Sequence, residues 1–199
     1  MPAWLALASA YLIGSVDFAV IVARAKGVDI HAVGSGNPGA SNVARSIGRG
    51  AAATVLVGDL LKGVIAAAMG WMAGAGAPDP VDEPLALAAG FLAVLGHCYP
   101  VFHRFRGGRG VATSGGVLLF VVPIAGLVAA GLWAIVVKLT RVAAIASLTV
   151  AVAAVPLAIW QGVTLPGLWW LLAMCGLVVI RHIPNIRRMI RGTEHEVSA

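Results

Sequence analysis

The sequence predicts an all-α integral membrane protein with seven transmembrane helices, two of them short. The chain has 199 residues, of which 60% are hydrophobic and only 11% are charged, whereas a soluble domain carries about 25% charged residues. Long apolar stretches follow one another along the chain, and one span needs about 20 such residues. The charged residues gather in the short segments between these stretches. We therefore expect residues 1–199 to form a single polytopic membrane domain.

Six apolar stretches are the predicted membrane segments: 3–23, 51–75, 84–102, 111–137, 142–160 and 163–180. The chain begins with the residues MPAW and has no lysine or arginine before Arg24. A secretory signal peptide begins with a basic region, so we interpret the first stretch as a membrane segment.

The basic residues set the predicted orientation. Thirteen of the 14 lysines and arginines lie in four segments, 24–50, 103–110, 138–141 and 181–199. Because basic loops stay in the cytoplasm, we expect the N-terminus outside and the C-terminus in the cytoplasm. The net charge of +6 would suggest nucleic-acid binding in a soluble protein. Clusters between apolar stretches fit membrane orientation better, so we expect no nucleic-acid partner.

Stretch 111–137 must then begin and end on the cytoplasmic side. A single helix cannot do this, but two short helices folded back at Pro123 can, because proline breaks a helix. The alternative is one long span, which gives six spans in all. That topology places Lys138, Arg141 and the basic tail outside, against the charge bias.

A glycine-rich loop after the first stretch is the first candidate site. Gly34, Gly36 and Gly39 allow backbone N–H groups to converge on an anion. Short polar donors stand between and after these glycines, and a basic residue follows one helical turn later: Ser35, Asn37, Ser41, Asn42 and Arg45. Because stretch 51–75 begins soon afterwards, a helix N-terminus is expected to face the same anion. The plain alternative is a flexible turn.

Two further segments combine fixed positive charge with glycine or amide groups. The first contains His97 and then the run Arg106, Gly107, Gly108, Arg109 and Gly110. The second contains Arg181, His182, Asn185 and Arg188, of which Arg181, Asn185 and Arg188 would share one face of a helical turn. Arginine holds phosphate but cannot act as a base. Topogenic arginines and packing glycines are the alternative interpretation.

Inside the second stretch, Asp59 and Lys62 are spaced to form an ion pair, and we interpret them as structural. Asp17 is a lone acid with no evident partner. No lysine belongs to a GK[ST] motif and no histidine is followed by the acid of an HxxxxD motif. We expect no ATP site, no metal and no cofactor.

Four motifs, in this order and spacing, resemble the bacterial acyl-phosphate–glycerol-3-phosphate acyltransferase family of the PlsY type: GSGNPGASNVAR, GDLLKG, GHCYPVFHRFRGGRGVATSGG and RHIPNIRR. The resemblance spans nearly the whole chain. It implies a seven-helix membrane enzyme that moves a fatty acyl group from acyl phosphate to the 1-hydroxyl of sn-glycerol 3-phosphate. The products would be lysophosphatidic acid and inorganic phosphate. The resemblance also implies the bacterial inner membrane as the location, with the active site on the cytoplasmic side and membrane lipid around the protein.

The resemblance also implies residue roles. The acyl-phosphate head would be cradled by Ser35, Gly36, Asn37, Gly39, Ser41 and Asn42, with Arg45 on a phosphate. His97 would line the site, and the phosphate-holding loop would consist of Arg106, Gly107, Gly108 and Arg109. Glycerol 3-phosphate would bind His182 and Asn185, with Arg181 and Arg188 nearby. The family often has lysines at 106 and 109 and threonine at 41; the arginines here cannot serve as proton shuttles.

The chemistry leaves the proton acceptor open. Acyl phosphate is already activated, so no ATP is needed, and N–H and amide donors can stabilise the oxyanion. His97, His182 or a substrate phosphate oxygen could accept the hydroxyl proton, and an acyl-enzyme on Ser35 is a further possibility. The rival functions are a transporter for a phosphorylated solute and a non-catalytic scaffold. A transporter needs access to its binding site from both sides of the membrane, whereas the polar loops are predicted to lie on one side only.

Overall fold

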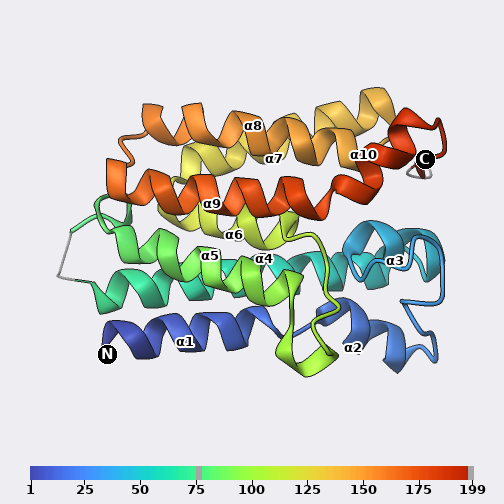
Figure 1. Ribbon diagram of the computed structural model, residues 1–199, viewed down its shortest axis with the longest axis horizontal. Helices are drawn as coiled ribbons and strands as arrows, with labels where there is room; N and C mark the ends of the chain where they lie inside the picture. The colour runs from blue at the N-terminus through green and yellow to red at the C-terminus, as the bar shows by residue number, and fades with distance from the viewer. Residues whose placement is uncertain (75–77, 197–199) are drawn as a thin grey trace.

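A computed structural model describes residues 1–74 and 78–196 of the chain, and the regular structure of these residues is entirely helical. Figure 1 shows most of the helices lying side by side along the long axis of the molecule. The helices are α1 (Ala3–Gly14), α2 (Phe18–Ala25), α3 (Ala40–Ser46), α4 (Arg49–Ala73), α5 (Pro84–Cys98), α6 (Val111–Val121), α7 (Pro123–Thr140), α8 (Ala143–Trp160), α9 (Leu165–Arg181) and α10 (Ile183–Ile190), with short 3₁₀ turns η1 (Pro80–Asp82) and η2 (Val101–His103).

The helices confirm an all-α integral membrane protein. By length and apolar composition, five segments of the described chain can cross a membrane: Ala3–Ala25, Arg49–Ala73, Pro84–His103, Pro123–Thr140 and Ala143–Trp160. A sixth follows if α9 and α10, which are bent by 48° relative to each other, count as one broken span. Helix α6 is apolar but shorter, so the total of seven spans stays a prediction.

The predicted fold-back in the fourth apolar stretch is present, but its two halves differ in length. Val122 separates α6 from α7, and Pro123 is the first residue of α7, where proline has no helical hydrogen bond to lose. The two helices run in opposite directions and pack together. Helix α6 has 11 residues and α7 has 18. The prediction of two short helices was wrong for α7, because the helix continues through Lys138 to Thr140.

The first apolar stretch is broken, although we expected one continuous helix. The hydroxyl of Ser15 donates to the carbonyl of Tyr11 at 2.9 Å, where α1 ends. The carboxylate of Asp17 then accepts the N–H of Val20 at 3.0 Å and caps α2. Short polar side chains that bond to nearby backbone in this way end helices and start new ones. Asp17, the lone acid of the sequence, is therefore a helix cap.

Glycines allow the central helices to approach closely. A Cβ at Gly63 of α4 would lie 2.1 Å from the carbonyl oxygen of Thr113, and one at Gly116 of α6 would lie 2.0 Å from that of Leu60. Small residues at helix contacts are the usual means of tight packing in membranes. The α4–α6 contact places the start of α6 against the middle of α4, close to Asp59 and Lys62.

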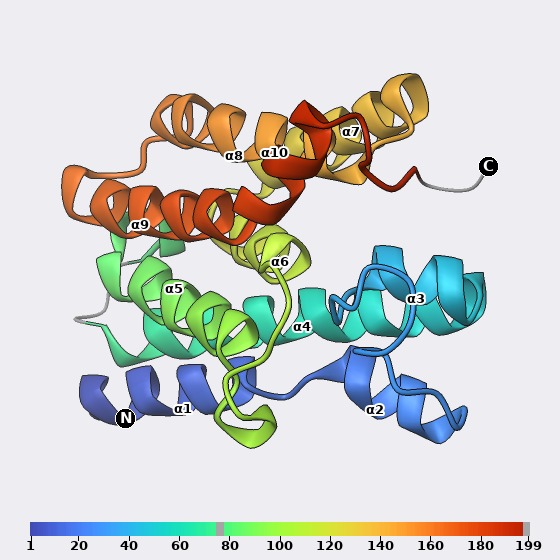
Figure 2. The ribbon, with the colours of Figure 1, turned by 45° about the vertical axis from the view of Figure 1, so that its right-hand side comes forward.

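The four basic segments lie toward one end of the bundle. In Figure 1 the α2–α3 region, the loop before α6, the α7–α8 link and the C-terminal tail all lie to the right of the centre, and Figure 2 shows the α2–α3 region and the C-terminal tail at the right-hand end. The opposite end carries the start of α5, where the carboxylate of Glu83 accepts the N–H of Leu85 as a helix cap. The polar motifs that are far apart in the sequence therefore meet in one region.

Candidate active site

Two adjoining cavities occupy the region where the motifs meet. The larger has a volume of about 730 Å³ and extends from the polar loops between α4, α6, α7, α8 and α9, with mostly apolar walls. The smaller has a volume of about 380 Å³ and is lined mainly by polar and basic residues. Ser35, Asn37 and Arg109 line both cavities. These three residues mark the place where an apolar chamber meets a basic one.

The glycine-rich loop is shaped from within by Asn42. Its side-chain oxygen accepts the N–H of Ser35 at 3.0 Å, and its nitrogen donates to the carbonyls of Val33 at 3.1 Å and Ile30 at 3.4 Å. Both donors of the amide are thus used inside the protein. Asn42 thus holds the loop in shape. It also lines the larger cavity, and its role in ligand binding stays a prediction.

The other predicted loop residues face the cavities. Ser35, Asn37, Gly39 and Ser41 line the larger cavity, and Gly36 lines the smaller. Gly36 has φ +67°, a left-handed backbone that side chains disfavour. The loop therefore presents both its backbone and its short polar side chains to the cavities.

The helix that follows this loop is α3, and not α4 as the sequence suggested. Arg45 lies on α3, one turn beyond Asn42, and lines the larger cavity. Burial lowers the pKa of Arg45, an effect that the carboxylate of Glu194 opposes and the charge of Arg188 strengthens. The guanidinium stays charged at neutral pH because arginine is a very strong base. Arg45 therefore offers a fixed positive charge to the larger cavity.

The loop before α6 is held by Arg181. The guanidinium donates to the carbonyl of Gly107 at 2.7 Å and to that of Gly108 at 3.0 Å, and it lies 5.0 Å from the centre of the Tyr99 ring. Arg181 also lines the smaller cavity. Arg181 therefore fixes the loop, and its role toward phosphate stays a prediction.

Gly108 sits where no larger residue fits. Its N–H donates to the carbonyl of His97 at 3.0 Å. A Cβ at this position would lie 2.2 Å from Nε2 of His97 and 2.7 Å from the carbonyl oxygen of Pro38. The loop thus presses directly against both the histidine and the glycine-rich loop.

Arg109 is the basic residue shared by the two cavities. Burial lowers its pKa most, and the neighbouring charges of Arg188, Arg45 and Arg181 lower it further while Glu194 raises it. Arginine keeps its charge at neutral pH even so. A half-buried positive charge among other positive charges attracts an anion strongly. Arg106, by contrast, is exposed and lines only the smaller cavity.

The third motif is divided between two helices, and this corrects the expectation of one shared face. Helix α9 ends at Arg181, and α10 begins at Ile183 after a bend of 48°. On α10, Asn185 donates to one oxygen of Glu194 at 2.9 Å, and Arg188 pairs with the other at 2.9 Å. Arg181 points instead to the loop before α6. Glu194, six positions after Arg188, was not among the predicted site residues, although it bonds to both side chains.

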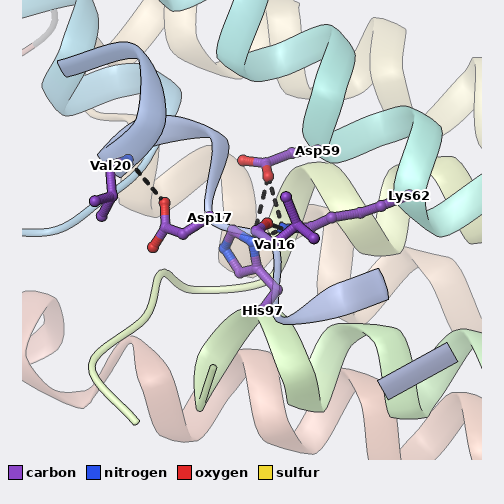
Figure 3. Close-up of polar contacts among 6 residues, drawn as sticks. All are labelled: Val16, Asp17, Val20, Asp59, Lys62 and His97. Atoms are coloured by element: carbon purple, nitrogen blue, oxygen red, sulfur yellow. Dashed lines mark hydrogen bonds and ion pairs between the residues drawn. The ribbon is translucent and has the colours of Figure 1, made fainter. Parts of the chain in front are cut away.

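The two site histidines differ in their partners. Nδ1 of His182 lies 2.8 Å from the carbonyl oxygen of Val178. Nδ1 of His97 lies 2.8 Å from Nζ of Lys62, which also pairs with Asp59 at 2.8 Å (Figure 3). The predicted Asp59–Lys62 ion pair is confirmed. Its link to His97 was missed because His97 lies 35 positions beyond Lys62 in the sequence.

Comparison with known proteins places the chain in a family. Residues 4–192 match the glycerol-3-phosphate acyltransferase family. A glycerol-3-phosphate acyltransferase of Burkholderia lata is 46% identical over 97% of this chain and 90% of its own length. The Pseudomonas aeruginosa PAO1 protein of the same name is 40% identical over 96% and 97%. The chain therefore belongs to the glycerol-3-phosphate acyltransferase family, and the resemblance found in the motifs is confirmed.

Two solved structures of this family have a similar fold. The crystal structure of PlsY (YgiH), an integral membrane glycerol 3-phosphate acyltransferase, in its glycerol 3-phosphate form is 35% identical, with a TM-score of 0.91 over 98% of this chain and 96% of that one. Its lysophosphatidic acid form gives a TM-score of 0.88 over 98% and 94%. Both the fold and the enzyme class, a membrane glycerol-3-phosphate acyltransferase, thus rest on matches along nearly the full length.

Proposed function

We propose that the chain transfers a fatty acyl group from acyl phosphate to the 1-hydroxyl of sn-glycerol 3-phosphate, forming lysophosphatidic acid and inorganic phosphate. The observation that carries this proposal is the junction of the two cavities. A long apolar chamber meets a basic chamber at Ser35, Asn37 and Arg109. An acyl chain with a phosphate at its carboxyl end matches the first chamber, and a small phosphorylated alcohol matches the second.

The reaction needs no external source of energy. The hydroxyl oxygen of glycerol 3-phosphate attacks the acyl carbonyl carbon, and the bond from that carbon to the phosphate oxygen breaks. The carbonyl oxygen carries negative charge in the transition state. Ser35 and Asn37, together with the backbone N–H groups of the glycine-rich loop, are the donors proposed to stabilise it. The hydroxyl proton ends on the released phosphate, directly or through one intermediate acceptor.

The arginines hold the two phosphates in the proposed complex. Arg109, at the junction, contacts the phosphate of the acyl donor, and Arg45 supports it from the larger cavity. Arg106, Arg181 and Arg188 line the smaller cavity and receive the phosphate of glycerol 3-phosphate. Fixed guanidinium groups of this kind bind phosphate and orient it at the same time. The two substrates are thereby placed with hydroxyl and carbonyl in contact.

The proposed orientation puts the active site at the cytoplasmic face of the inner membrane. The four basic segments lie toward one end of the bundle, and basic segments stay in the cytoplasm. Glycerol 3-phosphate would enter from the cytoplasm, and the acyl donor from the lipid phase. The glycine-rich loop and both arginine-bearing loops then face the compartment in which the polar substrate is dissolved.

The test is phosphate release by the detergent-purified protein. Palmitoyl phosphate is supplied with and without glycerol 3-phosphate, without ATP or added metal, and palmitoyl-CoA is supplied in parallel. We expect phosphate release and lysophosphatidic acid only with palmitoyl phosphate and glycerol 3-phosphate together. Turnover with palmitoyl-CoA alone as donor would overturn the acyl-phosphate assignment. Uptake of glycerol 3-phosphate into liposomes without acylation would replace the enzyme with a transporter.

A further inference from the structure

The ammonium group of Lys62 is surrounded by three acceptors. Its Nζ lies 2.8 Å from Oδ1 of Asp59, 3.0 Å from the carbonyl oxygen of Val16 and 2.8 Å from Nδ1 of His97 (Figure 3). The Lys62 and Asp59 side chains are 2% and 3% exposed. An ammonium group has three hydrogens and cannot accept a hydrogen bond. Because the ammonium can only donate, Nδ1 of His97, at 2.8 Å, must be the acceptor of this contact.

The alternative protonation is a neutral Lys62 beside a charged His97. It would put the shared proton on the imidazole, although an amine is ordinarily the much stronger base. It would also leave Asp59 paired at 3.5 Å with His97 in place of 2.8 Å with the ammonium. The shorter contact and the stronger base both place the charge on Lys62.

A neutral imidazole whose Nδ1 accepts carries its proton on Nε2. That nitrogen lies on the side of the ring that faces Gly108, as the 2.2 Å clash of a Cβ at Gly108 shows. Among the residues that the structure describes, no hydrogen bond joins Nε2 to another protein group. His97 lines the larger cavity and does not line the smaller one. The Nε2–H group is therefore available to a ligand of the larger cavity.

His182 is held in the opposite way. Its Nδ1 lies 2.8 Å from the carbonyl oxygen of Val178, and because a carbonyl can only accept, Nδ1 carries the proton. When the ring is neutral, its lone pair is on Nε2. Both histidines line the larger cavity. His97 can donate a hydrogen bond through Nε2, and His182 can accept one at Nε2.

We propose that Asp59 and Lys62 hold His97 in the Nε2–H tautomer, so that His97 donates a hydrogen bond to an oxygen of the acyl-phosphate group and does not accept the hydroxyl proton. Lys62 and Asp59 are positioning residues that act through His97. This inference rests on the proposed function, because it assigns the acyl donor to the larger cavity. The hydroxyl proton then passes to a phosphate oxygen or to Nε2 of His182, and His97 neither gains nor loses one.

The kinetic test separates a donor from a base. His97→Ala removes both capacities, and we expect kcat to fall about a hundredfold, as for other oxyanion donors. His97→Gln places an amide N–H near the position of Nε2 but cannot act as a base. We expect this variant to be at least about tenfold faster than His97→Ala, on the scale of one charge-assisted hydrogen bond. A glutamine variant as slow as the alanine variant would overturn the donor role.

The tautomer itself is tested by nitrogen NMR of wild-type protein labelled with ¹⁵N-histidine, with His97 assigned from the His97→Gln spectrum. At neutral pH we expect a protonated Nε2 and an unprotonated Nδ1. A protonated Nδ1 would contradict the inference whatever the activity. Because this readout needs no turnover, it also distinguishes failure of the tautomer from failure of the acyltransferase assignment, which the wild-type phosphate-release assay reports.

The role of Lys62 is tested by a double-mutant cycle. We expect Lys62→Met to lower kcat about tenfold in the wild-type background and to have no further effect in the His97→Ala background, because residues that act through one another are not additive. An equal loss in both backgrounds would show that Lys62 acts elsewhere. Asp59→Asn, which keeps an acceptor oxygen for the ammonium, is the milder companion variant and should keep the Nε2–H tautomer in the NMR spectrum.

Discussion

The two cavities are built from different parts of the chain. The larger is walled by helices and by small or aliphatic residues such as Ala129, Ala151 and Leu118, whereas the smaller is walled by loops and arginines. Helices provide apolar volume but few donors, since their backbone groups are already paired. Loops leave backbone and side-chain donors free. In the proposed function, the helices would therefore bind the acyl chain and the loops would bind the anion.

Replacing Arg109 should lower the activity most, because Arg109 lines both cavities. Arg109→Ala loses a charge-assisted contact of about 3 kcal/mol, so we expect kcat/KM to fall about a hundredfold. The matched control is Arg187→Ala, on the exposed side of α10 and outside both cavities. If both variants lose activity equally, the net charge matters and the position does not.

Gly108→Ala should have the second largest effect. The new methyl group would meet Nε2 of His97 and the carbonyl of Pro38, so the two loops must separate. We expect kcat to fall about tenfold, the usual scale for a small displacement of catalytic groups. Gly131→Ala is the control, since a Cβ there meets nothing within 4 Å. Unchanged kinetics of Gly108→Ala would mean that the loops can separate without consequence.

Glu194→Gln tests whether an ion pair holds the C-terminal tail against α10. The variant loses the ion pair with Arg188 but can keep the hydrogen bond to Asn185. We expect the melting temperature to fall by about 3 °C, which is about 1 kcal/mol for a chain of this size. Glu196→Gln is the control, because Glu196 is exposed. A melting temperature equal to that of the control would show that the tail is not held by this pair.

The smallest effect should come from the wall of the larger cavity. Ala130 lines it from α7 and is exposed at the surface, so Ala130→Trp narrows the chamber without filling a packed core. We expect the preference to move toward shorter acyl phosphates, measured as the ratio of kcat/KM for lauroyl and palmitoyl phosphate. Leu127→Trp, 65% exposed in the wild type and outside the cavities, is the control. The KM for glycerol 3-phosphate should not change in either variant.

Sequence patterns predicted the helical class, the fold-back at Pro123 and the segments that form the cavities, because apolar runs and clustered charge are local properties. They did not reveal α3, whose seven residues are too few for a periodic pattern. They also missed the break at Asp17, since the residues on both sides are equally apolar. Residue types in the sequence indicated the candidate hydrogen-bond donors. The tertiary structure shows which of these donors are already used within the protein.

The partners of the predicted site residues also depended on the tertiary fold, which sequence patterns do not give. Asn42 was chosen as a ligand donor for its amide, but three backbone groups of its own loop use that amide. Arg181 was grouped with Asn185 and Arg188 by helical spacing, but Pro184 lies at the start of a new helix. The bond between Lys62 and His97 joins two stretches that no spacing rule connects.

The larger cavity reaches the outside of the bundle at α4, where Leu56 lines it and is 43% exposed. An acyl donor that enters there is dissolved in the bilayer, so its effective concentration is its mole fraction among lipids rather than its amount per litre. Added detergent or inert phospholipid would then slow the enzyme by surface dilution at constant total substrate. The concentration of glycerol 3-phosphate, in contrast, would remain an ordinary bulk quantity.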